Sequence, residues 1–295
     1  MIDLVQPYLI QLGSVVIAMA AIYLLGCGVL LFGQNRFIFF PSRTLTATPN
    51  DLNLPYEDIQ IPVGSNPDQM AQIHGWWIPS SLGSNQPVLL HLHGNSSNIS
   101  ANLDHARQFY QMGLSVVLVD YRGYGQSTPQ FPSEKAVYED VEAVWNYLID
   151  QRGIHPNQIL VFGHSLGGAI AIELGMQHPD MAGLIVEGSF TSMRDMVDYR
   201  RKYRMFPINW LLQQRFNSIQ KVEQLKMPVL FTHGTDDQVV PPSMSEVLYA
   251  TATEPKQLLI VEQAAHNDVR QVGGVKYFKT LQQFVEKACS LQYQR

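Results

Sequence analysis

The sequence contains two cysteines among its 295 residues, Cys27 and Cys289. Two cysteines so far apart provide neither the framework of a disulfide-stabilised domain nor the ligand spacing of a zinc site. Charged residues are also scarce, at 15%, and a formal net charge of -5 gives no general attraction to polyanions. These absences exclude a disulfide-rich scaffold and argue against nucleic acid as a partner.

Apolar residues are plentiful instead, at 46% of the chain. A chain of this length and composition can bury one large domain around a complete sheet, and disorder is not expected. No internal repeat or low-complexity segment is visible. The composition therefore predicts a single globular domain, with one segment of a different character at the start.

That first segment lacks charge altogether, because no Asp, Glu, Lys or Arg occurs between residues 4 and 35. Residues 9–32 are almost continuously apolar, and about 20 residues suffice for a helix to span a bilayer. We therefore expect residues 1–35 to form an uncleaved transmembrane anchor and residues 36–295 to form the globular domain.

Two processed forms are the alternatives for this segment. Residues 18–20, Ala-Met-Ala, resemble a signal-peptidase site, but Asp3 stands where a signal peptide carries basic residues. Residues 24–27, Leu-Leu-Gly-Cys, resemble a lipoprotein cleavage site, but the apolar run continues beyond the cysteine.

The two sides of the apolar span differ in charge. Arg36 and Arg43 follow it, whereas no Lys or Arg precedes it. The positive-inside bias therefore predicts a single-pass membrane protein whose globular domain lies in the cytoplasm.

Beyond the span, short apolar runs alternate with segments of helical periodicity. The predicted strands cover residues 88–91, 115–120, 158–162, 183–186, 229–232 and 257–261. The predicted helices cover residues 99–112, 137–148, 242–251 and 275–288. This alternation predicts an α/β domain with a mostly parallel sheet covered by helices on both faces. Residues 57–63 and 72–79 read as an antiparallel hairpin at the sheet edge, and residues 190–226 as irregular.

One motif joins a predicted strand to a helix of small residues. Residues 163–167, Gly-His-Ser-Leu-Gly, match the G-x-S-x-G pattern of a nucleophile elbow. The backbone of the serine is strained in an elbow, and Gly163 and Gly167 would let the strand and the helix approach each other. A glycine-rich turn with an incidental serine is the alternative, but the strand and helix context favours Ser165 as a nucleophile.

A hydroxyl is a poor nucleophile unless a base takes its proton, so a histidine and an orienting carboxylate must follow in the order Ser, Asp, His. Asp236 and Asp237 directly follow one predicted strand, and His266 lies in the loop after the last one. Sites collect at these carboxyl ends in parallel sheets, and both aspartates remain candidates on this ground. His105 and His178 fall on predicted helices and are expected at the surface.

A developing oxyanion would need two preorganised donors. His93-Gly94-Asn95 ends the first buried parallel strand, which is the position of the loop that supplies one of them. We therefore expect the backbone N–H groups of Asn95 and Leu166 to form the oxyanion hole. This chemistry implies no metal ion and no organic cofactor.

Together these motifs resemble the alpha/beta-hydrolase-domain serine hydrolases, specifically the membrane-anchored subgroup that includes protein depalmitoylases and related esterases. The resemblance runs from about Arg36 to the end of the chain and rests on the motifs FFP (39–41), HGN (93–95), DYRGYGQS (120–127), GHSLGG (163–168), HGTDDQVVPP (233–242) and HND (266–268). In the family pattern H-G-x-x-D the acid falls on Asp237. The resemblance thus implies the alpha/beta-hydrolase fold, a triad of Ser165, Asp237 and His266, and hydrolysis of ester or thioester bonds in acyl substrates.

Residues 190–226, which we name the cap segment, depart from the family pattern where substrate choice is usually made. Its basic residues Arg194, Arg200, Arg201, Lys202 and Arg204 precede an apolar run, residues 205–212. Such a pair suits anionic lipid headgroups and acyl chains, with Phe206, Trp210 and Leu211 facing substrate or membrane. A solvated helix that packs on the domain through its aromatic residues is an equal alternative.

The sequence is compatible with two other functions. Peptidases with a similar catalytic domain exist, so a serine peptidase or amidase is the second candidate. A non-catalytic binding protein on the same fold is the third, because fold alone does not prove activity. The sequence predicts neither the acyl chain length nor the oligomeric state.

Overall fold

The computed structural model describes residues 2–64 and 70–292. Within them an eight-stranded sheet has the order β10-β9-β8-β7-β4-β6-β3-β2. Its strands are β2 (Glu57–Val63), β3 (Ala71–Ile78), β4 (Val88–Leu92), β6 (Ser115–Val119), β7 (Ile159–His164), β8 (Gly183–Glu187), β9 (Val229–Gly234) and β10 (Lys256–Val261). Neighbours from β10 through β6 pair in parallel, whereas β3 is antiparallel to both β6 and β2. The predicted parallel sheet and its antiparallel edge hairpin are confirmed.

The central strands are buried on both faces, which explains their continuous apolar runs. Every residue of β4, β6, β8 and β9 is buried, whereas the edge strand β2 alternates between exposed and buried positions toward its end. Helices must therefore cover both faces of the central strands.

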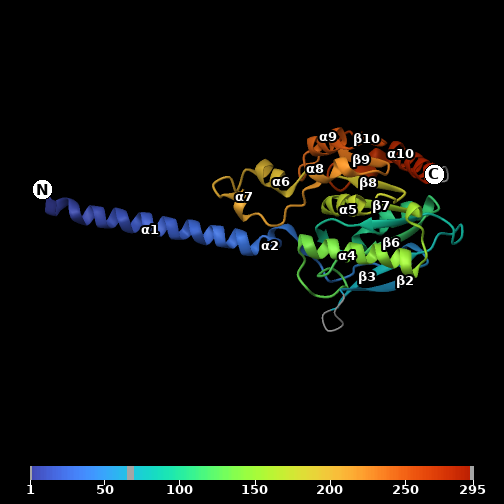
Figure 1. Cartoon of the computed structure of the whole chain (residues 1–295), viewed down its shortest axis with the longest axis horizontal. Helices are drawn as coiled ribbons and strands as arrows, with labels where there is room; N and C mark the ends of the chain where they lie inside the picture. The colour runs from blue at the N-terminus through green and yellow to red at the C-terminus, as the bar shows by residue number, and fades with distance from the viewer. Residues whose placement is uncertain (1, 65–69, 293–295) are drawn as a thin grey trace.

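Helices cover the sheet in two layers (Figure 1). They are α3 (Leu103–Gln111) and α10 (Val269–Gln292) on one face, and α4 (Glu134–Asn146), α5 (Leu166–Gln177) and α9 (Pro242–Thr251) on the other. Successive residues of a strand point to opposite faces, so Val161 packs in the core under α4, α5 and α9, and Phe162 in the core under α3 and α10.

The helix boundaries differ from the predicted ones where side chains cap the ends. Ser133 accepts a hydrogen bond from the N–H of Ala136, and α4 therefore starts at Glu134, three residues before the predicted start at residue 137. The cap segment is more regular than predicted. It contains the short helices α6 (Met193–Arg200), α7 (Ile208–Leu211) and α8 (Ser218–Lys221).

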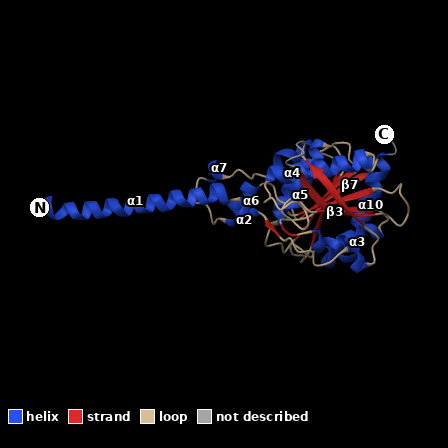
Figure 2. Ribbon diagram, turned by 90° about the horizontal axis from the view of Figure 1, so that it is seen from below, coloured by secondary structure: helices blue, strands red, loops and turns tan. Residues whose placement is uncertain are grey.

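The first helix, α1 (Ile2–Gly33), projects away from the domain as one rod (Figures 1 and 2). Within residues 11–33 the most apolar stretch of 18 residues has a mean hydropathy of 2.6, and none of that stretch is buried by the rest of the chain. By length and composition this helix can cross a membrane. The short helix α2 (Asn35–Ile38) connects it to the sheet domain.

The cap segment meets α1 at the point where that helix reaches the domain. Gln34 accepts hydrogen bonds from the N–H groups of Gln213 at 2.8 Å and Gln214 at 3.0 Å through its side-chain oxygen. Its side-chain nitrogen donates to the carbonyl of Leu211 at 3.1 Å. A buried glutamine thus fastens the end of α7 to the end of α1.

Candidate active site

Strand β7 turns into helix α5 at Ser165, whose backbone has φ 54° and ψ -118°. This positive φ is strained for any residue other than glycine. A Cβ atom added at Gly163 would lie 2.3 Å from the carbonyl oxygen of Gly167, and one at Gly167 would lie 2.1 Å from that of Leu92. With this backbone, both positions accept only glycine.

Three side chains from the carboxyl ends of β7, β9 and β10 converge beside this turn. The Ser165 hydroxyl donates to His266 Nε2 at 3.0 Å, and His266 Nδ1 donates to Asp237 Oδ2 at 2.6 Å. All three residues are buried. Because the carboxylate fixes the proton on Nδ1, Nε2 is free to accept the serine proton.

The structure separates the two neighbouring aspartates. Asp236 is exposed and accepts a hydrogen bond from the Thr235 hydroxyl at 3.0 Å. Only Asp237 of the pair reaches His266, which is the arrangement that the family pattern implies.

The Asp237 carboxylate is held by several donors. Its Oδ1 accepts the N–H groups of Val239 at 2.8 Å and Val240 at 2.9 Å, and His233 Nε2 lies 3.0 Å from its Oδ2. Burial alone would raise the pKa of Asp237, but the bonds from His233, His266 and the Val240 N–H outweigh burial and hold this pKa well below its usual value. The negative charge beside His266 is therefore permanent at neutral pH.

Sequence reasoning missed the part that His233 plays, although this residue opens the H-G-x-x-D motif. Its Nε2 faces two acceptors, Asp237 and the Val240 carbonyl at 3.0 Å, so Nε2 carries the proton. Its Nδ1 then accepts a hydrogen bond from the Ser245 hydroxyl at 2.7 Å. His233 is fully buried and contacts the same carboxylate oxygen, Oδ2, as His266.

His164, inside the elbow motif, contacts the loop after β10 that carries His266. Its Nε2 lies 3.0 Å from the carbonyl oxygen of His266. Burial lowers the pKa of His164, so its neutral ring donates to this carbonyl. The position of His266 is thus set by its main chain as well as by Asp237.

The expectation that His105 and His178 are surface residues is wrong. Both are half-buried. His105 Nδ1 lies 3.4 Å from His91 Nε2, and burial lowers the pKa of His105 to about 4. His178 stacks on Trp145 with ring centres 4.5 Å apart and contacts Glu142 at 2.8 Å. Helical periodicity alone did not indicate these neighbours.

The predicted oxyanion donors belong to the loop after β4 and to the start of α5. Leu166 is the first residue of α5, so its N–H has no acceptor within the helix and lies at the positive end of the helix dipole. Asn95 precedes β5 (Ser96–Ser97), which pairs with β1 (Phe40–Pro41). The Asn95 carbonyl accepts from the Phe40 N–H at 2.8 Å and the Tyr124 hydroxyl at 2.7 Å, which fixes the loop.

A cavity of about 610 Å³ opens above these groups, and Ser165, Asn95 and Leu166 all line it. Most of the other side chains around it are apolar and come from α2, α6 and neighbouring loops: Phe37, Phe40, Phe190, Met193, Met196 and Val197. The predicted cap residues lie elsewhere. Phe206 stacks on Tyr23 of α1, Trp210 is 87% exposed, and Leu211 lines a smaller cavity next to α1.

Several known proteins are similar to this chain in sequence or in fold. A family model described as "Serine aminopeptidase, S33" matches residues 83–221. The alpha/beta hydrolase domain-containing protein WAV2 of Arabidopsis thaliana is 30% identical over 308 residues, covering 97% of this chain and 96% of that protein. The chain belongs to the alpha/beta-hydrolase family.

Two further proteins are similar to this hydrolase. The protein bem46 of Schizosaccharomyces pombe is 30% identical over 277 residues, covering 91% of each chain. The Pyrococcus furiosus esterase Pf2001 has the same fold, with a TM-score of 0.69 at 20% identity, over 85% of this chain and 98% of that structure. The likeness to this structure shows the fold, and membership of the family supports a hydrolase.

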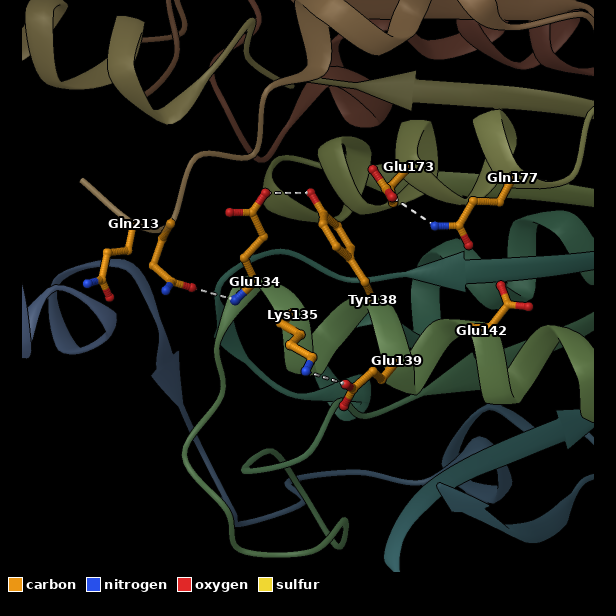
Figure 3. A pocket seen from close by; sticks show the side chains of 9 residues that line it. Glu134, Lys135, Tyr138, Glu139, Glu142, Glu173, Gln177 and Gln213 are labelled. Atoms are coloured by element: carbon orange, nitrogen blue, oxygen red, sulfur yellow. Dashed lines mark hydrogen bonds and ion pairs between the residues drawn. The ribbon is translucent and has the colours of Figure 1, made fainter. Parts of the chain in front are cut away.

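A second cavity, of about 460 Å³, lies between α4, α5 and residues 213–214 of the hydrolase (Figure 3). None of the predicted site residues lines it. Its Glu134 accepts hydrogen bonds from the Tyr138 hydroxyl at 3.0 Å and from the Phe216 N–H at 2.7 Å. This acidic pocket therefore fastens the returning end of the cap segment to α4.

Proposed function

We propose that the protein is a serine hydrolase that cleaves carboxylic ester or thioester bonds of acyl substrates through an acyl-enzyme. The observation that carries the proposal is the chain of hydrogen bonds from Ser165 through His266 to Asp237, which ends at the floor of an apolar cavity. A nucleophile, a base and an orienting acid in this order are the parts that acyl transfer requires.

In the proposed reaction His266 Nε2 takes the proton of Ser165 while Oγ attacks the acyl carbonyl carbon. The oxyanion of the tetrahedral intermediate accepts hydrogen bonds from the N–H groups of Asn95 and Leu166, which contribute several kcal/mol of stabilisation. His266 then protonates the leaving alcohol or thiol. Water repeats the sequence on the acyl-enzyme and releases the acid, and Asp237 stabilises the imidazolium throughout. Apart from the substrate and one water molecule, side chains and main-chain amides of this chain supply every group in these steps.

We propose further that residues 1–35 anchor the enzyme in a membrane, with the domain of residues 36–295 on the cytoplasmic side and residues 190–226 as its cap. The exposed apolar surface of α1 and the arginines Arg36 and Arg43 support this orientation. The substrates are then acyl lipids or acylated proteins, as in the depalmitoylase subgroup that the sequence resembles.

Amide hydrolysis is the second candidate function. The matching family model is described as a serine aminopeptidase, which favours it. Three substrates that carry the same acyl group, as an ester, a thioester and an amide, separate the candidate functions. We expect turnover of the ester and thioester to exceed that of the amide, and preferred cleavage of the amide would contradict the proposal.

Covalent labelling tests the nucleophile. We expect a fluorophosphonate probe to label the full-length native protein and not to label Ser165→Ala. The far-ultraviolet circular dichroism of Ser165→Ala should equal that of the native protein, which shows that the variant is folded. Ser96→Ala is the matched control, because it removes an exposed hydroxyl beside Asn95 and should label normally. Absence of labelling in the folded native protein would favour the non-catalytic binding protein.

A further inference from the structure

Two cavities meet between α1 and the cap segment. The smaller one, about 130 Å³, is lined on one side by Leu30 of α1 and by Gln34, which follows that helix, and on the other by Ile208, Leu211 and Leu212. It shares five lining residues with the larger cavity that holds Ser165, namely Phe37, Ile38, Met193, Val197 and Tyr203. The two cavities are therefore adjacent, and we name the largely apolar region that they occupy, from the flank of α1 to Ser165, the passage.

Beyond the lining of this passage, residues 205–210 of the cap segment, which we name the cap tip, contact the apolar helix α1. The Tyr23 hydroxyl donates to the Met205 carbonyl at 3.1 Å, and the Tyr23 ring stacks on Phe206 with centres 5.5 Å apart. A Cβ atom at Gly26 would lie 2.9 Å from the Phe206 ring, so this glycine lets the ring lie against the helix. Gly26 precedes Gly33 by seven residues, which at 1.5 Å per residue places the cap tip about 10 Å inside the apolar span.

The exposed side chains of the cap segment are of two kinds, apolar ones at the cap tip and cations nearby. Met205 is 70% exposed and Trp210 is 87% exposed, although both are large and apolar. Exposed cations lie on the cap segment and beside α1: Arg36, Arg200, Arg201, Lys202 and Arg204. An apolar tip fits the hydrocarbon region, and the cations complement anionic headgroups.

We propose that the substrate reaches Ser165 laterally, from within the bilayer, through the passage between α1 and the cap segment. The proposal rests on the hydrolase function proposed above. The occupant of the passage is an acyl chain seated in the membrane, whose ester or thioester bond lies at the level of the headgroups. Such a chain slides from lipid to the apolar cavity without crossing water, and therefore without exposing its apolar surface.

A tryptophan in the passage tests this route. We compare hydrolysis of a fluorogenic long-chain ester embedded in phosphatidylcholine and phosphatidylserine vesicles with hydrolysis of a water-soluble short-chain ester. Leu30→Trp fills the small cavity from α1, and we expect the ratio of vesicle to soluble kcat/KM to fall about tenfold. Val29→Trp, at a neighbouring position that is 50% exposed and does not line the cavity, is the matched control and should leave the ratio unchanged.

Each outcome has one meaning. An unchanged ratio in Leu30→Trp, or an equal loss on both substrates, overturns the lateral route. Leu212→Trp fills the same cavity from the cap segment and gives an independent measurement if Leu30→Trp disturbs the packing of α1. A native protein that hydrolyses neither substrate and takes no fluorophosphonate contradicts the proposed function itself, and the route with it.

A vesicle-bound S-acyl peptide, run as a second arm, distinguishes an acylated protein from a lipid as the source of the acyl chain.

Discussion

At the scale of single residues, two adjacent aspartates give the sharpest prediction. Asp237→Asn keeps the shape of the side chain but removes the charge that orients His266, so we expect kcat on a soluble ester to fall by roughly 10⁴-fold. Asp236→Asn, one residue away and exposed, should retain native kcat. Equal losses in both variants would contradict the assignment of Asp237.

The sequence predicts the roles of some residues at the site and not those of others. Ser165, Asp237 and His266 follow from a motif and from chain order, because parallel strands bring their carboxyl ends to one edge. The supporting bonds of His233 and His164 did not follow. A histidine in a motif carries no sign of which acceptor its ring faces, since that depends on loops distant in sequence.

At the scale of elements, the strands were predictable and the cap segment was not. Strands buried on both faces must be apolar throughout, so their runs stand out in the sequence. The short helices of the cap segment depend on particular bonds instead. Ser192 caps α6, and Glu134 holds the Phe216 N–H from 82 residues away. Neither bond leaves a periodic pattern.

The packing of α3 against the sheet predicts a response to acid. Burial lowers the pKa of His105 to about 4, compared with about 6.5 in an unfolded chain. Between these values the unfolded state binds more protons, so the free energy of unfolding decreases as the pH falls from about 6.5 to about 4. We expect His105→Gln to flatten the dependence of Tm on pH in this window.

His155 supplies the control for this measurement. It is exposed, so His155→Gln should leave the slope of Tm against pH at its native value. A His105→Gln protein with an unchanged slope would show that proton uptake elsewhere governs acid destabilisation.

At the scale of the whole molecule, Trp210 reports how the proposed enzyme sits on a membrane. Trp76 and Trp145 are buried and Trp77 is half-buried, which leaves Trp210 as the widely exposed indole among the four tryptophans. We expect brominated lipids in vesicles to quench its fluorescence, and Trp210→Phe to remove the quenched component. Trp77→Phe should keep that component, and a native protein without quenching would place the cap tip in water.

Gln34 makes three hydrogen bonds with residues 211–214, so removal of residues 1–34 would do more than change the solubility of the protein. A shortened protein that starts at Asn35, after both α1 and Gln34, would lose one wall of the passage and the fastening of residues 211–214 together. We expect Gln34→Leu to reproduce the second effect alone, as faster amide hydrogen exchange at Gln213 and Gln214. We therefore expect a truncated protein, made for crystallisation or assay, to cleave dissolved esters still. It would lack the lateral entry by which a membrane-embedded substrate reaches Ser165.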